Sequence, residues 1–211
     1  MEEQMGNQAG AHGNTLEDFR FDANRKGFDQ LFKDTTDLWK VNLADLVLVT
    51  LVFVLVAWIP VVNAGFFAGY FRALRKVVRR ERPAIADIFS AWDCFGSALV
   101  YGIGVFVAEI ILGMLPVLGW VAGLALLFFA TPGFFAIADR NVSPITAAKW
   151  NVAAFKGDLG GWVAVLLVGG LIANAGFLVL VLGGLFTLPW GGLLMVMQYV
   201  SQGDLDVAEE E

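Results

Sequence analysis

The positively charged residues of this chain are confined to three short stretches. All fourteen Lys and Arg residues lie within residues 20–40, 72–82 and 140–156. The other segments are strongly apolar, and 58% of the chain is hydrophobic, whereas ordinary soluble domains contain about 45–50% apolar residues. Because Lys and Arg beside apolar spans stay on the cytoplasmic side of a membrane, the pattern predicts a membrane protein whose chain returns three times to that side.

We therefore predict an all-α, polytopic membrane protein with six short transmembrane helices, arranged as three hairpins with cytoplasmic amphipathic helices between them. The predicted six-helix membrane domain covers residues 41–202. One helix over residues 43–71 would be about 43 Å long, well beyond the roughly 30 Å hydrocarbon core, and would place neighbouring basic blocks on opposite sides. A hairpin of two short helices, 43–58 and 64–80, avoids both problems, and the single long helix is the alternative.

The later spans are predicted at residues 97–114 and 120–138, with two more within residues 159–200. This last apolar stretch has about 42 residues, which accommodates two crossings. Its turn is expected either at Gly183-Gly184 or at residues 174–176.

Three segments have the apolar periodicity of helices that lie on a membrane surface. They are residues 24–40, the segment from Pro83 to Phe95, and a segment that begins at Pro144. In the first, Trp39 is expected at the level of the lipid headgroups. In the last, the apolar face consists of Ile145, Ala148, Val152 and Phe155.

The two ends of the chain are polar. Residues 1–23 are expected to form a disordered leader, because they cannot bury enough apolar surface to offset the entropy of ordering. Residues 203–211 form an acidic tail.

Two short motifs carry a resemblance to a known group of proteins. The first consists of Gly69, Tyr70, Arg72 and Arg75, and the second of Pro144, Ala147 and Asn151. With the amphipathic segments that follow, they resemble prokaryotic multi-pass membrane proteins of unknown function. The membrane domain found with some glycerophosphodiester phosphodiesterases is similar in style. The resemblance covers roughly residues 40–202 and implies a helical membrane fold. It brings no catalytic residues, because the phosphodiesterase chemistry belongs to a separate soluble domain.

The densest basic block is a candidate site for a lipid headgroup or a partner protein. Clusters of cations beside a membrane attract anionic lipids, but the same cluster also serves as a plain topology signal without any ligand. The candidate residues are Arg72, Arg75, Lys76, Arg79, Arg80 and Arg82.

Glu109 is the one ionisable residue deep in the middle predicted hairpin. A carboxyl group inside a membrane is costly and is a functional candidate by default. The alternative is that Glu109 reaches the headgroups or bonds to a neighbouring helix. Other polar residues in the predicted spans, Asn63, Asn174 and Gln198, are candidates to meet it or to pair helices through hydrogen bonds.

Several functional classes are disfavoured by composition. A net charge of −6 argues against nucleic acid as a partner. One Cys and one His cannot supply the ligands of a zinc site, and no cofactor is expected. No paired catalytic groups are visible around Cys94 or His12, so we do not expect an enzyme.

The leading hypothesis is a membrane scaffold or accessory subunit in the plasma (inner) membrane, with both termini cytoplasmic. It would contact a partner protein or anionic lipid at the cytoplasmic face. The alternative is a small transporter or channel for an ion or lipid that uses Glu109.

Overall fold

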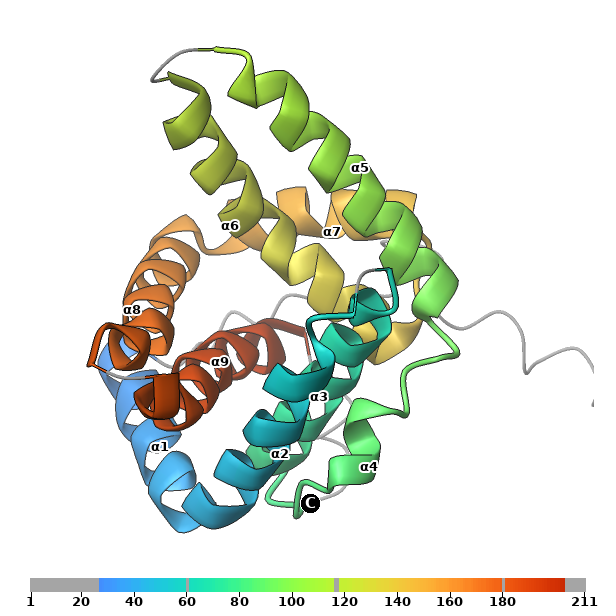
Figure 1. The fold of residues 1–211 in the computed structure, drawn as a ribbon. Helices are drawn as coiled ribbons and strands as arrows, with labels where there is room; N and C mark the ends of the chain where they lie inside the picture. The colour runs from blue at the N-terminus through green and yellow to red at the C-terminus, as the bar shows by residue number, and fades with distance from the viewer. Residues whose placement is uncertain (1–26, 60, 116–117, 180, 204–211) are drawn as a thin grey trace, which may run out of the picture.

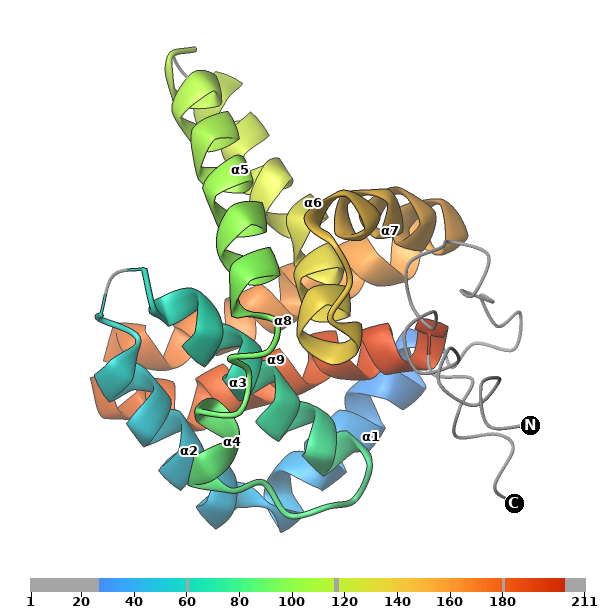
Figure 2. The same cartoon turned by 90° about the vertical axis from the view of Figure 1, so that its right-hand side faces the viewer.

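A computed structural model describes residues 27–59, 61–115, 118–179 and 181–203 (Figures 1 and 2). Every regular element within these ranges is an α-helix, which confirms the all-α part of the predicted fold class. The helices are α1 (Phe28–Val41), α2 (Leu43–Val56), α3 (Asn63–Val78), α4 (Ile85–Ile88), α5 (Phe95–Gly113), α6 (Leu118–Arg140), α7 (Pro144–Gly157), α8 (Leu159–Val179) and α9 (Val181–Gly203). The predicted disordered leader and nearly all of the acidic tail lie outside the described residues.

Three of these helices are long and apolar enough to cross a membrane: α5, α6 and the part of α8 from Leu159 to Gly176. The pair α1 and α2 meets the same test only when taken together, and it is bent by 86° at the junction. The count therefore reaches four if this bent pair crosses as one span. With 14 and 16 residues, α2 and α3 are about 21–24 Å long, which is shorter than the roughly 30 Å hydrocarbon core.

Aromatic side chains join α3, α6 and α9 at the centre of the molecule. Phe71 of α3 stacks on Phe135 of α6 with ring centroids 4.5 Å apart. Tyr199 of α9 packs edge-on against both rings, at 5.6 Å and 5.9 Å. Trp150 of α7 lies 5.9 Å from the same tyrosine. Aromatic pairs of this kind contribute about 0.5–1.5 kcal/mol each beyond their burial, so this cluster fixes the mutual positions of four helices.

Helices α5 and α6 run side by side and project from the rest of the molecule (Figures 1 and 2). Their outward side chains are large and apolar, and Phe106, Ile111 and Trp120 are 65%, 61% and 85% exposed. Exposed apolar area of this extent is not found on ordinary soluble monomers. The surface of this helix pair is therefore suited to contact with lipid.

The two helices at the end of the chain pack through small residues rather than through a glycine turn. Gly176 of α8 faces Gly183 of α9, and Gly191 of α9 faces Gly169 of α8, so closely that a Cβ at Gly176 or Gly191 would collide with the opposite backbone. Both predicted turn positions are therefore wrong, because residues 174–176 and 183–184 lie inside helices. The glycines serve close helix packing, as they do in membrane proteins generally.

The first predicted surface helix is present as α1, and its apolar face packs on protein. Leu31 is 2% exposed and clusters with Val165 of α8 and Leu194 of α9. Trp39 stacks on Trp190 at 5.3 Å, and its indole N–H donates to the carbonyl of Phe186. The sequence predicted that this face lies on the membrane surface, and α9 covers it instead.

The second predicted surface helix is reduced to the single turn α4. The amide groups of Phe89 and Ser90 bond three residues back, to Ala86 and Asp87, which tightens the last turn. The carbonyl of Ser90 then accepts a hydrogen bond from Arg72, and no longer from a following backbone N–H. The predicted helix to Phe95 is therefore wrong, because an arginine from α3 takes the carbonyl that would continue it.

The third predicted surface helix is confirmed as α7, which begins at Pro144 after its N-cap residue Ser143. Its buried face carries Ala147, Trp150 and Asn151. The apolar residues that the sequence placed on one face lie away from this buried face: Ile145 is 72% exposed and Val152 is 42% exposed. This helix thus has one face against protein and an apolar face that points outward.

Candidate functional site

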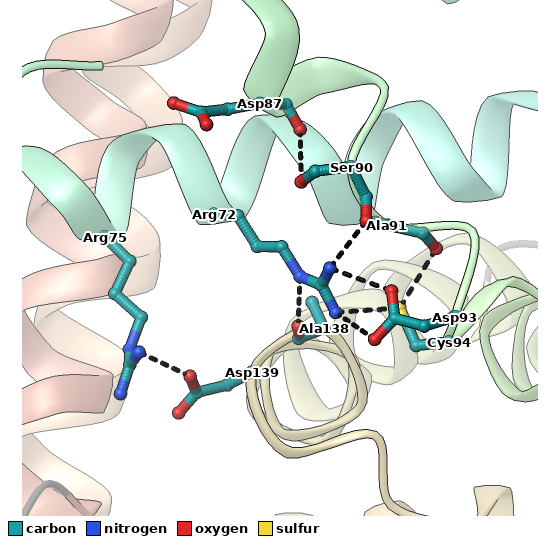
Figure 3. A network of polar contacts seen from close by, with 9 residues as sticks. All are labelled: Arg72, Arg75, Asp87, Ser90, Ala91, Asp93, Cys94, Ala138 and Asp139. Atoms are coloured by element: carbon teal, nitrogen blue, oxygen red, sulfur yellow. Dashed lines mark hydrogen bonds and ion pairs between the residues drawn. The ribbon is translucent and has the colours of Figure 1, made fainter. Parts of the chain in front are cut away.

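Arg72, the first residue of the basic block, is held in an intramolecular clamp (Figure 3). Its two terminal nitrogens donate to the two carboxylate oxygens of Asp93, each at 2.8 Å. Its Nε donates to the carbonyl of Ala138 in α6, and Nη1 also donates to the carbonyl of Ser90, both at 2.8 Å. The guanidinium therefore ties α3 to α6 and to the segment that precedes α5. This hydrogen-bonded ion pair also lowers the pKa of the Asp93 carboxyl.

Arg75 forms the most enclosed ion pair of the described residues. Its guanidinium lies 2.8 Å from a carboxylate oxygen of Asp139, and the side chains are 17% and 5% exposed. The other oxygen of Asp139 accepts a hydrogen bond from the Tyr199 hydroxyl at 3.2 Å and lies 3.8 Å from Arg140. Asp139 is thus the polar centre at which α3, α6 and α9 meet.

The remaining basic residues of the block differ in how far they are exposed. Lys76 lies 2.6 Å from Asp87, beside the start of α4. Arg79, Arg80 and Arg82 are exposed. Arg80 has a φ of 62°, and the amides of residues 80 and 81 bond back to Val77 and Lys76. These are the bonds of a Schellman helix end, so α3 ends where the exposed cations begin.

The candidate basic site therefore consists of two different groups of residues. Arg72, Arg75 and Lys76 hold helices together, whereas Arg79, Arg80 and Arg82 face outward. Sequence reasoning missed this division because the partners Asp87, Asp93 and Asp139 are 11, 21 and 64 residues away from their cations. The one sequence signal for these ion pairs is that an aspartate lies in or beside each of the helices α4, α5 and α6.

Asn151, a residue of the second motif, bonds to α6 beside a proline inside that helix. Pro132 has no N–H and strains the helix around it. The amide of the next residue, Gly133, donates to the side-chain oxygen of Asn151 in α7. The Tyr101 hydroxyl of α5 donates to the carbonyl of Ala130 at 2.8 Å and accepts from the same asparagine. The backbone groups of Ala130 and Gly133, on either side of Pro132, are thus satisfied by side chains of α5 and α7.

The glycine at this bend is also required for contact between helices. A Cβ on Gly133 would collide with the backbone carbonyl of Ala147. Gly69 plays the same role in the first motif, because a Cβ there would collide with the carbonyl of Ile88 in α4. Both motifs therefore serve helix packing: the first brings α3 against α4, and the second brings α7 against α6.

A cleft of about 620 Å³ lies between α3, α5, α6 and α9, and we call it the four-helix cleft. Most of its wall consists of phenylalanine, leucine, valine and alanine side chains. Along α5 the wall extends from Ala98 to Glu109, which is about 16 Å at the rise of an α-helix. At the rim, Phe106, Leu127 and Phe67 are 65%, 51% and 48% exposed. The cleft therefore opens sideways onto the apolar outer surface. Five lining residues carry side-chain polar groups: Asn63, Tyr70, Tyr101, Glu109 and Thr131.

The hydroxyl groups in this wall are already bonded within the protein. The Tyr70 hydroxyl lies 2.9 Å from the hydroxyl of Thr50, and Tyr101 bonds to Ala130. The Thr131 hydroxyl donates to the carbonyl of Leu127 at 2.9 Å. Glu109 differs, because its Oε1 is shut off from the surface and has no hydrogen-bond partner among the described residues.

Glu109 is positioned by a glycine on the neighbouring helix. Its carboxyl group lies over Gly123 of α6, where a Cβ would collide with Oε2. Nearby, Gly119 lies against the backbone carbonyl of Leu112, so α5 and α6 are at their closest here. The Glu109 carboxyl group thus occupies space that is open only because residue 123 is a glycine.

The other predicted intramembrane polar residues do not gather at one site. Asn63 lines the four-helix cleft with Glu109. Asn174 is exposed and donates to the carbonyl of Gly170 in its own helix. Gln198 is 1% exposed and donates to Asp158 at the start of α8. Only one of the three predicted companions therefore shares the cleft with Glu109.

The described residues contain no group of three or more His, Cys, Asp or Glu side chains placed to hold a metal ion. Cys94 is buried, and burial raises the pKa of its thiol. A thiol with a raised pKa is a poor nucleophile. His12 lies outside the described residues.

None of the protein-family models, curated proteins or solved structures with which the chain was compared matches it. The resemblance to prokaryotic multi-pass membrane proteins therefore stays a prediction.

Proposed function

We propose that the protein is a non-enzymatic, six-span membrane protein that binds the hydrocarbon chain of a membrane amphiphile in the four-helix cleft. The observation that carries this proposal is the cleft itself, which has an apolar wall and a side opening. Of the two functions that the sequence leaves open, this is the one in which Glu109 takes part. It serves to hold, carry or present a lipid.

The size of the cleft fits one leaflet of a bilayer. Its length of about 16 Å along α5 is close to half of the roughly 30 Å hydrocarbon core. A chain that enters from the membrane through the rim at Phe106 and Leu127 exchanges lipid contacts for contacts with aromatic side chains. The hydrocarbon chain is not exposed to water at any point of this exchange.

The proposed layout keeps all cations on the cytoplasmic side of the plasma (inner) membrane, together with both termini. The pairs α2–α3, α5–α6 and α8–α9 each cross outward and back. The short helices α2 and α3 fit a bilayer that is locally thinned, at a modest cost. The exposed apolar residue Ile145, at the start of α7, supports this layout because it can enter the lipid interface at the cytoplasmic side.

Filling the cleft tests the proposal. Gly102 lines the cleft, and a Cβ added there meets no atom within 4 Å. Gly102→Phe therefore adds a large side chain to the cleft wall at a position where its first atom has room. The matched control is Gly104→Phe, on the same helix and equally open, but outside the cleft wall.

Purified protein in phospholipid vesicles is exposed to a hexadecanol analogue that carries a diazirine, and labelled peptides are mapped by mass spectrometry. We expect labelling of cleft residues, with a loss of several-fold in Gly102→Phe and no loss in Gly104→Phe. Equal labelling of the two variants, or labelling of the outer surface alone, contradicts the proposal.

The exposed cations favour a second candidate function at the cytoplasmic face. Arg79, Arg80 and Arg82 lie together after the end of α3, where they can contact anionic headgroups or an acidic partner, each worth about 1 kcal/mol near a charged membrane. This is the scaffold or accessory role predicted from the sequence. Changing all three to Gln should weaken the association of anionic lipid with the protein in nanodiscs, and unchanged association contradicts this role.

A further inference from the structure

We propose that the protein has a second lipid site, which binds the head of a phospholipid that carries both a phosphate and a primary ammonium group. The site is a groove of about 630 Å³ between α1 and the ends of α3 and α9, and we call it the α1–α9 groove. Its volume is within the roughly 300–1,000 Å³ of small-molecule sites. It shares no lining residue with the four-helix cleft, so the inference goes beyond the proposed function and does not rest on chain binding there.

The wall of the α1–α9 groove carries both signs of charge. Asp34 and Asp37 line it from α1, three residues apart and therefore on the same face of that helix. Arg80 lines it from the end of α3. Most of the remaining wall is apolar, and Leu38 and Met197 are among its members. A head bound in the groove therefore meets a cation and carboxylates at once.

The charges that line the groove are not neutralised within the protein. Neither Arg80 nor Asp37 forms an ion pair or a side-chain hydrogen bond with another described residue, although both line one groove. A guanidinium pairs with phosphate through two parallel hydrogen bonds, and an ammonium group offers three donors to carboxylates. A head with both groups therefore satisfies both charges, whereas a purely anionic head would meet the aspartates as like charges.

The backbone at Arg80 indicates that its side chain has a role. Its φ of 62° is in the left-handed region, which favours glycine at the end of a helix. A residue that is held in such a conformation at some cost in stability is a functional candidate. A ligand that the Arg80 side chain binds in the groove accounts for an arginine at this position.

The groove adjoins a surface that is suited to lipid. Val41, in its wall, is 85% exposed, and α2 begins two residues later. On α2, the side chains of Leu48 and Leu55 are 49% and 68% exposed. The acyl chains of a lipid can therefore lie along α2 while its head occupies the groove, which favours a lipid over a soluble zwitterion.

Lipid binding in mild detergent tests the inference. Purified protein is titrated with phosphatidylethanolamine, phosphatidylcholine or phosphatidylglycerol that have the same acyl chains, and native mass spectrometry gives the Kd of the first bound lipid. All three lipids carry the phosphate, but the choline head has no N–H donor and the glycerol head has no cation. Because hydrogen bonds between charged groups are the strong ones, we expect phosphatidylethanolamine to bind roughly tenfold more tightly than either of the others.

Two variants assign this preference to the groove. In Asp37→Asn the advantage of phosphatidylethanolamine should fall to about threefold or less, because only the Asp34 carboxylate remains. Its control is Asp29→Asn, on the same helix but outside the groove wall, which should keep the advantage. Arg80→Gly should weaken the binding of all three lipids roughly tenfold, and the protein stays folded because glycine suits this φ. Its control is Arg82→Gln, which removes the same charge outside the groove wall and should leave the three affinities unchanged.

Three results would overturn the inference. Equal affinity for the three lipids, with no effect of Asp37→Asn, would show that the ammonium group is not recognised. Tightest binding of phosphatidylglycerol, weakened equally by Arg80→Gly and Arg82→Gln, would show a general attraction of the exposed cations for anionic lipid, as in the second candidate function. Displacement of the lipid by an equal concentration of soluble phosphoethanolamine would show that the ligand is not a lipid. The ratios among lipids with identical chains do not depend on the four-helix cleft, so this inference and the proposed function fail separately.

Discussion

The ion pair between Arg75 and Asp139 should dominate the stability of the helix assembly. The change Asp139→Asn keeps the shape of the side chain and removes its charge, which leaves a guanidinium that is 17% exposed without its carboxylate. Breaking an enclosed pair in this way costs about 3–5 kcal/mol. The matched control is Asp93→Asn, because Asp93 also pairs with an arginine of α3 but its side chain is 50% exposed. Exposed pairs contribute about 0–1 kcal/mol.

The free energy of unfolding is measured by titrating SDS into mild-detergent micelles, with tryptophan fluorescence as the readout. We expect Asp139→Asn to lose at least about 2 kcal/mol more than Asp93→Asn. Adding Arg75→Met to Asp139→Asn should restore part of the loss, because the enclosed cation that has lost the Asp139 carboxylate is then gone. Equal losses for the two single variants would refute the view that Asp139 is the polar centre of the fold.

Three further predictions use the same titration. Asn151→Ala removes the acceptor of the Gly133 amide and should cost about 1–3 kcal/mol, and no loss would mean that the bend in α6 is satisfied otherwise. Arg80→Gly should raise the free energy of unfolding by about 1 kcal/mol, because a φ of 62° suits glycine at a helix end; a decrease would contradict this. The hydrogen bond from Arg72 lowers the pKa of Asp93, so its contribution is present above the unfolded pKa of about 3.9 and is lost as the pH falls through the lower folded pKa. The advantage of wild type over Asp93→Asn should therefore shrink below about pH 4, and a constant difference would contradict the assignment.

The sequence predicts most helix positions because apolar periodicity and charge placement are local signals. The helices expected at 43–58, 97–114 and 120–138 correspond closely to α2, α5 and α6. The helix expected from Pro83 fails because its end depends on Arg72, a residue on a different helix. A contact between distant segments leaves no periodic trace in the chain.

Glycine is ambiguous in the same way. The glycines of the last apolar stretch suggest a turn, since glycine both permits turns and allows close helix contact. The structure uses Gly176 and Gly183 for contact between α8 and α9. Only the opposite helix decides between the two roles.

The candidate site could be predicted only in part. A lone glutamate in an apolar stretch identifies Glu109 as a functional candidate, and the cleft wall does contain it. The aromatic side chains that build the rest of the wall come from α3, α5 and α6, and they have no sequence feature that separates them from ordinary core residues. The basic block shows the opposite error, because charge density suggests a ligand where Arg72 and Arg75 bind carboxylates of the same chain.

Labelling of single cysteines in intact cells tests most directly the claim that the chain crosses outward and back three times. In a Cys94→Ala background, cysteines are placed at exposed positions beside the three far ends, Trp58, Leu118 and Leu182, and at the exposed residue Arg82. We expect a membrane-impermeant maleimide to label the first three sites from outside, and to label Arg82→Cys only after the membrane is permeabilised. Labelling of any of the first three sites from the cytoplasmic side alone would contradict the layout and the sideways opening of the cleft that depends on it.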